Sequence, residues 1–247
     1  MAVFNPFSLE GKTILVTGAS SGIGRGIAVA CSKNGAKVVL NGRNIQKMQE
    51  TLSLMEGDGH SLAVGDLTNN ETLVELVGTL QKLDGIVHCA GFGERTLCKN
   101  VTEGDIDKMM SVNFKAPVLF QSEVLRQKKI NKGGSIVFIA SISNDFPSMG
   151  NGLYAASKGA LISYAKCLQL ELAPRLIRVN CISPAMVWTD LIFKGGLTEA
   201  ELQKDELKYP LKRYGQPEDV AYLAIYLLSD ASAWMTGSNV KITGGVS

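Results

Sequence analysis

The sequence contains few histidines and no closely spaced cysteines. Only 2 of its 247 residues are histidine, so we expect no cluster of metal ligands and no bound metal. The 5 cysteines form an odd set without a close pair, which is typical of reduced thiols and not of a disulfide framework. These shortages argue against a metal-centred or disulfide-stapled scaffold.

Strong net charge and long apolar runs are missing as well. The 25 basic and 23 acidic side chains leave a net charge of +2, too balanced for a nucleic-acid or membrane-surface footprint. No run approaches the roughly 18 apolar residues that span a bilayer. The first residues lack a basic segment followed by an apolar one, so we expect no secretion signal. We therefore expect a cytoplasmic protein with neither a nucleic-acid nor a membrane partner.

Short β-branched runs alternate with longer helical stretches along the chain. The runs predicted to be strands are residues 12–18, 36–42, 60–66, 84–91, 134–141, 177–184 and 239–245. Several are apolar almost throughout, as expected for strands covered on both faces. The alternation implies right-handed βαβ crossovers, and no repeat or linker marks a domain boundary. We predict one α/β domain over residues 1–247, with a doubly wound, seven-stranded parallel sheet flanked by helices on both faces.

A glycine-rich loop, TGASSGIGRG, follows the first predicted strand. Glycines at these positions allow a tight turn and a close approach of the backbone to a pyrophosphate, which the N-terminus of the next helix attracts. Glycine-rich turns also serve as plain strand–helix connectors, so the loop alone is only moderately specific. The residues expected to line a dinucleotide here are Gly18, Ser20, Ser21, Gly22, Ile23 and Gly24.

The ends of the next three strands carry further candidate cofactor residues. The second strand ends without the acidic residue that binds the ribose hydroxyls of NAD, and Arg43 follows it. A guanidinium there favours the 2′-phosphate of NADP, unless Arg43 belongs to a plain surface loop. Asp66–Leu67 ends the third strand, where Asp66 is expected to bind the adenine amine or to cap the next helix. Ala90 and Gly91, at the end of the fourth strand, are small enough to leave room for a cofactor.

Several motifs occur together in the order seen in short-chain dehydrogenases/reductases. They are TGASSGIG, HCAG, MSVNF, FIASIS, YAASK and SPAMVWT, and the chain resembles this family from about residue 9 to residue 245. The resemblance implies a Rossmann fold, a nicotinamide cofactor, and an assembly that is usually a homotetramer and sometimes a homodimer. It also implies a catalytic tetrad formed by Asn113, Ser141, Tyr154 and Lys158, in which Asn113 holds a water that connects the lysine to solvent.

Tyr154 and Lys158 lie four residues apart, so they share one face of a helix. Such a pair alone is usually a chance surface pair, but Ser141 at the end of a predicted strand and Asn113 upstream favour a catalytic role. The lysine ammonium, together with the charge of an oxidised nicotinamide, is expected to lower the pKa of the phenol from about 10. Tyr154 then exchanges a proton with a carbonyl or alcohol oxygen, and Ser141 gives that oxygen a second hydrogen bond.

The sixth predicted strand leads into SPAMVWT. By the resemblance, Pro184 fixes the turn, and the Val187 backbone and the Thr189 hydroxyl hold the nicotinamide carboxamide. Residues 188–214 mix apolar and charged side chains around Gly195-Gly196. We predict a helical lid over the substrate with a hinge at these glycines, and the alternative is an ordinary surface excursion.

The pattern is closest to that of 3-oxoacyl-(acyl-carrier-protein) reductases within the family. We predict an NADPH-dependent reductase that converts a ketone, with a 3-oxoacyl thioester as a candidate, to a secondary alcohol, with Tyr154 as general acid/base. NAD(H) stays open because Ser21 stands where NADP-preferring relatives often have a basic residue. The alternatives are a dehydrogenase that oxidises a sugar, polyol or other secondary alcohol and a binding protein that only keeps the fold. Basic residues at 126–134 either stabilise a helix C-terminus or bind an acidic acyl carrier protein.

Overall fold

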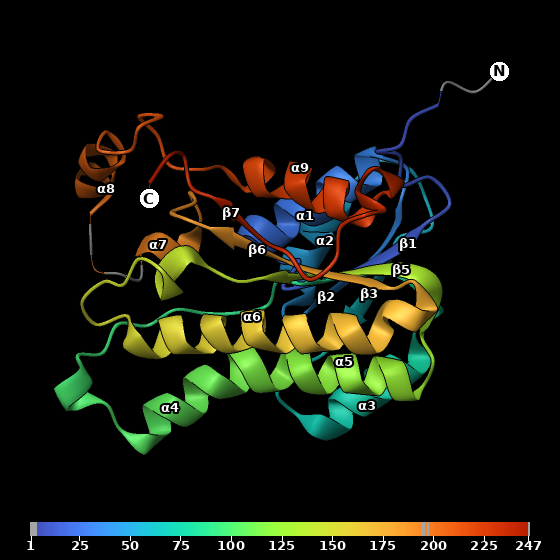
Figure 1. The fold of residues 1–247 in the computed structure, drawn as a ribbon, viewed down its shortest axis with the longest axis horizontal. Helices are drawn as coiled ribbons and strands as arrows, with labels where there is room; N and C mark the ends of the chain where they lie inside the picture. The colour runs from blue at the N-terminus through green and yellow to red at the C-terminus, as the bar shows by residue number, and fades with distance from the viewer. Residues whose placement is uncertain (1–3, 194–195, 197, 247) are drawn as a thin grey trace.

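The computed structural model describes residues 4–193, 196 and 198–246, which form a parallel sheet with helices on both faces (Figure 1). The sheet consists of β1 (Thr13–Thr17), β2 (Lys37–Gly42), β3 (Ser61–Val64), β4 (Leu83–His88), β5 (Ile130–Ile139), β6 (Arg178–Pro184) and β7 (Asn239–Ile242). The strand order is β3-β2-β1-β4-β5-β6-β7, and all neighbouring pairs are parallel. The predicted fold class is confirmed.

Two helical layers bury the two faces of the sheet (Figure 1). The first layer contains α1 (Gly22–Lys33), α2 (Ile45–Ser53) and α9 (Pro217–Leu228), and the second contains α3 (Asn70–Thr79), α4 (Glu103–Met110), α5 (Ala116–Arg126) and α6 (Gly152–Leu172). In β1, Ile14 and Val16 pack in the first layer's core, whereas Leu15 packs in the second layer's core. Because consecutive side chains are buried on opposite faces, the strands are continuous apolar runs in the sequence.

The order of the strands reverses between β1 and β4. Beyond the carboxyl ends of these two strands lies the topological switch point, where ligands bind in doubly wound sheets. The loops that follow the two strands touch, since a Cβ atom on Gly18 would lie 2.8 Å from the Cα atom of Ala90. The glycine loop therefore lies at the edge of the sheet where the sequence predicts a cofactor.

Strand β5 differs from the prediction at both ends. It begins at Ile130, not at residue 134, and it ends at Ile139, two residues before Ser141. Leu83 of β4 pairs with Ile130, but the next pair is Gly85 with Ser135, so the register shifts near the start of the strand. This irregular pairing depends on the partner strand and is not visible in the local sequence.

Arg178 connects the start of β6 to the end of α9. Its side chain donates hydrogen bonds to the carbonyl oxygens of Leu227 (2.7 Å) and Ser229 (3.0 Å) and to the hydroxyl of Ser232 (2.6 Å). Burial lowers the pKa of this guanidinium, and the charge of Asp230 opposes this shift without reversing it. A cation at the carboxyl end of a helix also interacts favourably with the helix dipole.

The structure contains neither a membrane-spanning helix nor a metal cluster among residues 4–193, 196 and 198–246. For the membrane, no helix in these ranges is both long and apolar enough. For a metal, these ranges hold no group of three or more His, Cys, Asp or Glu side chains placed to bind an ion. All five cysteines are unpaired thiols.

Candidate active site

The glycine loop needs its glycines for conformation and for space. Gly18 has a φ of +67° and Gly22 a φ of +52°, both in the left-handed region that other residues rarely adopt. A Cβ atom on Gly24 would collide with the Gly18 carbonyl oxygen, so the first turn of α1 packs directly on the loop. The loop is thus a tight cradle that any side chain at Gly18 or Gly24 would fill.

The start of α1 is open to an anion. Ser21 is the N-cap residue of this helix, but its side chain makes no capping hydrogen bond. Amide groups of the first turn are therefore left without a side-chain acceptor at the positive end of the helix dipole. Ser20 lies beside Gly42 at the end of β2, since a Cβ atom on Gly42 would be 3.7 Å from the Ser20 Cβ. Ile23 packs against the core and fixes the first turn. These features fit the pyrophosphate of a dinucleotide.

Arg43 and Asp66 lie side by side beyond β2 and β3. Their side chains form a loose ion pair of 3.4 Å, and the Arg43 side chain is 75% exposed. Asp66 accepts hydrogen bonds from the Thr68 amide (2.9 Å) and hydroxyl (2.8 Å). Burial raises the pKa of Asp66, but these bonds and Arg43 outweigh it, so the pKa is lowered and the side chain is a carboxylate. The N-cap of α3 is Asn69, so the expectation that Asp66 caps this helix is wrong, while Leu67 is buried in the core.

Thr17, at the end of β1, fixes the backbone after β4. Its hydroxyl accepts hydrogen bonds from the amides of Cys89 and Ala90, both at 3.0 Å. This residue is not among those predicted from the sequence, although a threonine that ends an otherwise apolar strand is a usable signal. As a result, Ala90 and Gly91 are held against the glycine loop.

His88 is a structural residue next to the site. Its ring is 3% exposed, stacks on Phe138 and bonds through Nε2 with the Gln121 side-chain oxygen at 3.0 Å. Burial lowers its pKa to about 4, so the imidazole is neutral near pH 7. A neutral ring held between aromatic neighbours does not act on a substrate beyond the end of β4.

Asn113 sits in a π-helical turn, Ser111–Lys115, between α4 and α5. Its side chain is fully buried and forms a two-way pair with the Phe92 backbone, accepting from the amide and donating to the carbonyl, each at 2.9 Å. It also donates to the Ser157 hydroxyl at 3.1 Å, and Ser157 in turn donates to the Tyr154 carbonyl at 2.8 Å. Ser157, which is also not among the residues predicted from the sequence, therefore ties Asn113 to the helix that carries Tyr154 and Lys158.

Lys158 is buried between α6 and the end of β5. Its ammonium donates to the Ile139 carbonyl at 2.9 Å and lies 5.8 Å from the centre of the Tyr154 ring. Burial lowers the pKa of Lys158 from 10.5 to about 8. A Cβ atom on Gly91 would lie 3.3 Å from this ammonium and 3.1 Å from the Asn113 side-chain oxygen, so Gly91 lies directly over these two groups.

Tyr154 and Ser141 face each other between α6 and the loop after β5. Burial raises the pKa of Tyr154, and the Ser141 hydroxyl opposes this shift without reversing it. In the protein chain alone, burial therefore outweighs the neighbouring groups, and the lowering of the pKa of Tyr154 by Lys158 together with an oxidised nicotinamide stays a prediction. The Ser141 oxygen also accepts a hydrogen bond from the Ser143 amide at 3.1 Å, which orients its side chain.

The loop after β6 contacts the glycine loop. Pro184 is buried at the end of the strand, and Val187 forms a bridge with Gly215. Thr189 reaches the glycine loop, because a Cβ atom on Gly22 would lie 3.1 Å from its methyl group. The three residues expected to hold a nicotinamide thus lie on one segment that reaches the dinucleotide cradle.

The described part of residues 188–214 contains two short helices, α7 (Asp190–Phe193) and α8 (Glu199–Glu206). The Trp188 ring nitrogen donates to Glu206 at 2.8 Å, and the Tyr214 hydroxyl donates to Asp205 at 2.7 Å. These bonds tie α8 to both ends of the segment. Of the two glycines predicted as a hinge, Gly196 has a φ of +80°, whereas residue 195 lies outside the described residues.

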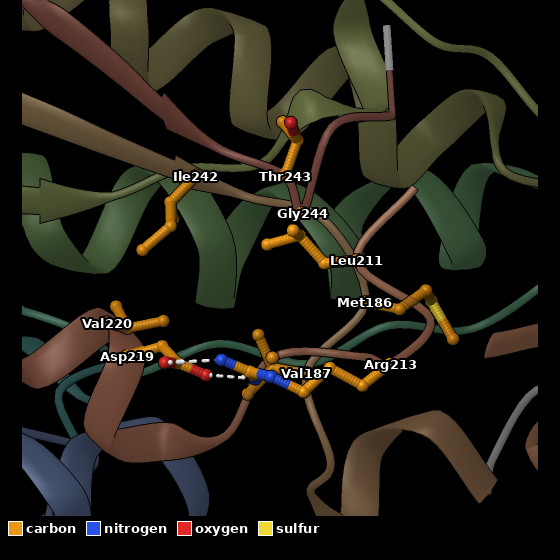
Figure 2. A pocket seen from close by; sticks show the side chains of 10 residues that line it. Met186, Val187, Leu211, Arg213, Asp219, Val220, Ile242, Thr243 and Gly244 are labelled. Carbon is orange, nitrogen blue, oxygen red and sulfur yellow. Dashed lines mark hydrogen bonds and ion pairs between the residues drawn. The ribbon is translucent and has the colours of Figure 1, made fainter. Parts of the chain in front are cut away.

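A cavity of about 240 Å³ lies between the loop after β6 and the residues at the end of β7 (Figure 2). Arg213 and Asp219 form a two-bond ion pair of 2.6 and 3.0 Å along one wall, and most of the remaining lining is apolar. The lining includes Val187 but not Asn113, Ser141, Tyr154 or Lys158. This cavity is therefore separate from the predicted catalytic residues.

The basic residues at 126–134 lie where β5 begins, at the amino end of the parallel strands and opposite the predicted site. Arg126 pairs with Glu123, and Lys129 donates to the carbonyls of Gly78 (2.8 Å) and Leu80 (2.6 Å) at the end of α3. This part of the segment thus stabilises helix ends, although Lys129 serves a neighbouring helix. The irregular strand β5 separates its start from Ser141 by roughly 25 Å.

Comparisons with known proteins identify the class of this chain. A family model described as Enoyl-(Acyl carrier protein) reductase matches residues 18–247. The chain is 36% identical over 238 residues to the 3-oxoacyl-(acyl-carrier-protein) reductase FabG of Rickettsia conorii, covering 96% of this chain and 98% of the relative. Together with the fold, these matches define an oxidoreductase of the doubly wound type.

Solved structures give the same result. A putative short-chain alcohol dehydrogenase from Sinorhizobium meliloti superposes with a TM-score of 0.89 at 31% identity, covering 98% of both chains. A putative NAD(P)-dependent gluconate 5-dehydrogenase from Beutenbergia cavernae, with bound NADP, superposes with a TM-score of 0.87 at 31% identity, also covering 98% of both. The chain belongs to the short-chain dehydrogenase/reductase family, whose members bind NAD(P).

Proposed function

We propose that the protein uses NADPH to reduce a ketone to a secondary alcohol, and that a 3-oxoacyl thioester is its substrate class. The observation that supports this most strongly is the packing of Asn113 and Lys158 around Gly91 and the end of β5, with the Tyr154 ring beside Gly93. Proteins similar to this chain are named as 3-oxoacyl-(acyl-carrier-protein) reductases, which favours a thioester over a simple ketone.

The cofactor would be held mainly by the segments that follow β1 and β6. Gly18, Gly22 and Gly24 would hold the pyrophosphate, and the segment from Pro184 to Thr189 would hold the nicotinamide carboxamide. When bound, the reduced nicotinamide supplies a hydride to the carbonyl carbon. The protein's own side chains handle the proton that the carbonyl oxygen must receive.

Tyr154 is placed to donate that proton. Because burial raises the pKa of its phenol, the hydroxyl is protonated near neutral pH, as a general acid in the reductive direction must be. Ser141 donates a hydrogen bond to the same oxygen and stabilises the negative charge that develops on it. Lys158, anchored on the Ile139 carbonyl, returns a proton toward the phenolate, and Asn113 lies on the route from the lysine to solvent.

Replacing Tyr154 with phenylalanine tests this mechanism. The variant keeps the ring but loses the proton, so we expect kcat to fall about 100-fold or more in the reduction of an acetoacetyl thioester. NADPH binding, read by nicotinamide fluorescence, should stay within a few fold of wild type. Normal turnover by the Tyr154→Phe protein would overturn the assignment of the general acid.

Arg43 supports the choice of NADPH over NADH. Its guanidinium is exposed beyond β2, and its contact with Asp66 is a loose 3.4 Å pair that a phosphate can replace. We expect NADPH to bind at least tenfold more tightly than NADH, about 1.4 kcal/mol. Arg43→Ala should remove most of this preference, whereas Arg126→Ala at the far edge of the sheet should keep it. Equal binding of the two cofactors by wild type would refute the role of Arg43.

A second candidate function is the oxidation of a sugar, polyol or other secondary alcohol. The observation that favours it is the likeness to a structure described as a putative gluconate 5-dehydrogenase. Turnover with NAD⁺ and a sugar acid or polyol, combined with no reduction of 3-oxo compounds by NADPH, would select this function over the first.

The partners and the lid follow from the same proposal. We propose a homotetramer or homodimer that accepts its thioester from an acyl carrier protein, with residues 188–214 closing over it. A carrier bound at residues 126–134 would lie roughly 25 Å from Ser141 of the same chain, so we propose that it would serve the site of another chain in the assembly. A lower KM for the carrier-bound thioester than for the coenzyme A thioester would support the carrier, and equal values would contradict it.

A further inference from the structure

Gly93 is a glycine that the backbone conformation does not require. Its φ lies outside the left-handed region, unlike those of Gly18 and Gly22. A Cβ atom built on Gly93 meets nothing closer than 3.6 Å, so an alanine would fit without moving its neighbours. The missing side chain therefore leaves an open gap about the size of one methyl group.

This gap lies beside the phenol of Tyr154. The Cβ position of Gly93 is 3.6 Å from Cδ2 and 3.7 Å from Cε2 of that ring, and Cε2 is adjacent to the carbon that carries the hydroxyl. The gap is also bounded by Cδ1 of Leu191 in α7, at 3.8 Å from the same Cβ position. The walls are thus the ring proposed as general acid and the first helix of segment 188–214.

We propose that Gly93 and Leu191 limit the size of one substituent of the ketone. In a 3-oxoacyl compound, this is the alkyl group on the side of the keto carbon that faces away from the ester or thioester. A carbonyl oxygen that meets the Tyr154 hydroxyl brings its substituents next to this ring, and the gap offers space for a methylene group there. The site then accepts an unbranched chain on the carbonyl carbon and excludes a branched one. This inference rests on the proposed function, since it concerns the substrate that Tyr154 protonates.

The test compares 3-oxo esters whose keto carbon, C3, carries a methyl, ethyl, propyl or isopropyl group. For Gly93→Val, we expect kcat/KM to fall at least tenfold for the propyl compound and less than threefold for the methyl compound, because the new side chain occupies the gap. Gly93→Ala should show the same trend with a smaller amplitude. Leu191→Ala widens the gap from its other wall and should raise kcat/KM for the isopropyl compound severalfold.

Gly78→Ala is the matched control. Gly78 lies in α3, its φ is also outside the left-handed region, and its Cβ position meets only the Gln127 side-chain oxygen, at 3.8 Å. This variant should keep the wild-type dependence on substituent size. NADPH titration of each variant checks that the cofactor cradle is intact, and if Gly93→Val does not fold, Gly93→Ala and Leu191→Ala decide the question.

The outcomes separate this inference from the proposed function. If wild type reduces none of these ketones, both are overturned. If wild type reduces them but the variants at Gly93 and Leu191 lower kcat/KM equally for all substituents, or leave it unchanged, only the inference fails. A change in the size dependence in opposite directions for Gly93→Val and Leu191→Ala supports it.

Discussion

Replacing Lys158 with methionine should change how the stability of the protein depends on pH. The ammonium is 4% exposed, and its folded-state pKa of about 8 is below its ordinary value of 10.5. Between these two values the unfolded chain binds more protons than the folded chain, so the free energy of unfolding rises with pH. The penalty for burying the charge is fully present below about pH 8 and is gone above about pH 10.5. Methionine keeps most of the volume and removes the titration.

The size of this effect follows from the shift in pKa. A difference of 2.5 units between 10.5 and about 8 corresponds to about 3 kcal/mol. Between pH 7 and pH 10, linkage predicts that wild type gains about 2–3 kcal/mol relative to Lys158→Met. Other groups that titrate in this range are common to both proteins, so they cancel in the comparison.

Urea unfolding at several pH values from 7 to 10 measures this difference, provided that the m-values of the two proteins agree. Lys166→Met, on the exposed side of the same helix α6, is the matched control and should follow wild type. Parallel curves for wild type and Lys158→Met would refute the view that the lysine is buried at a cost. A relative loss of stability by wild type as pH rises would refute the sign of the shift.

Three further predictions concern packing and hydrogen bonds. Gly24→Ala drives a methyl group into the Gly18 carbonyl, so it should lower the free energy of unfolding by about 1–3 kcal/mol and weaken NADPH binding at least tenfold; unchanged binding in a fluorescence titration would contradict the tight cradle. Ser157→Ala removes an acceptor of the Asn113 amide and should lower the free energy of unfolding, measured in urea, by about 1 kcal/mol. An unchanged free energy of unfolding would contradict a stabilising role of this bond. Arg178→Met leaves two carbonyls and a hydroxyl without their buried donor and should cost about 3 kcal/mol, a result that equal stability of the variant would exclude.

The fold was predictable from the sequence because its strands are buried on both faces. Continuous apolar runs such as residues 13–17 mark these strands without any knowledge of their neighbours. The start of β5 was not predictable, since its first residue, Ile130, joins the sheet through a shifted register with β4. Register belongs to the pair of strands and not to either sequence alone.

The site was predictable from the sequence only where a spacing or a residue type allowed a single structural role. The four-residue spacing places Tyr154 and Lys158 on one face of α6, as the sequence predicts. The N-cap of α3 was predicted wrongly because Asp66 and Asn69 are both good caps, and the Thr68 hydrogen bonds occupy the first. The rise in the pKa of Tyr154 that burial causes in the chain alone was not predictable, because desolvation depends on how tightly the surrounding segments pack.

The π-helical turn Ser111–Lys115 limits which insertions and deletions this region can tolerate. The wider turn adds about one residue to the regular helical repeat, which advances the angular phase of all following residues by roughly 100°. Deleting one residue from the turn would restore an ordinary helix but rotate either Asn113 out of the site or the buried side of α5 away from the sheet. Substitutions in this turn act locally, whereas a single-residue insertion or deletion would put one half of the helix out of phase with the rest of the protein.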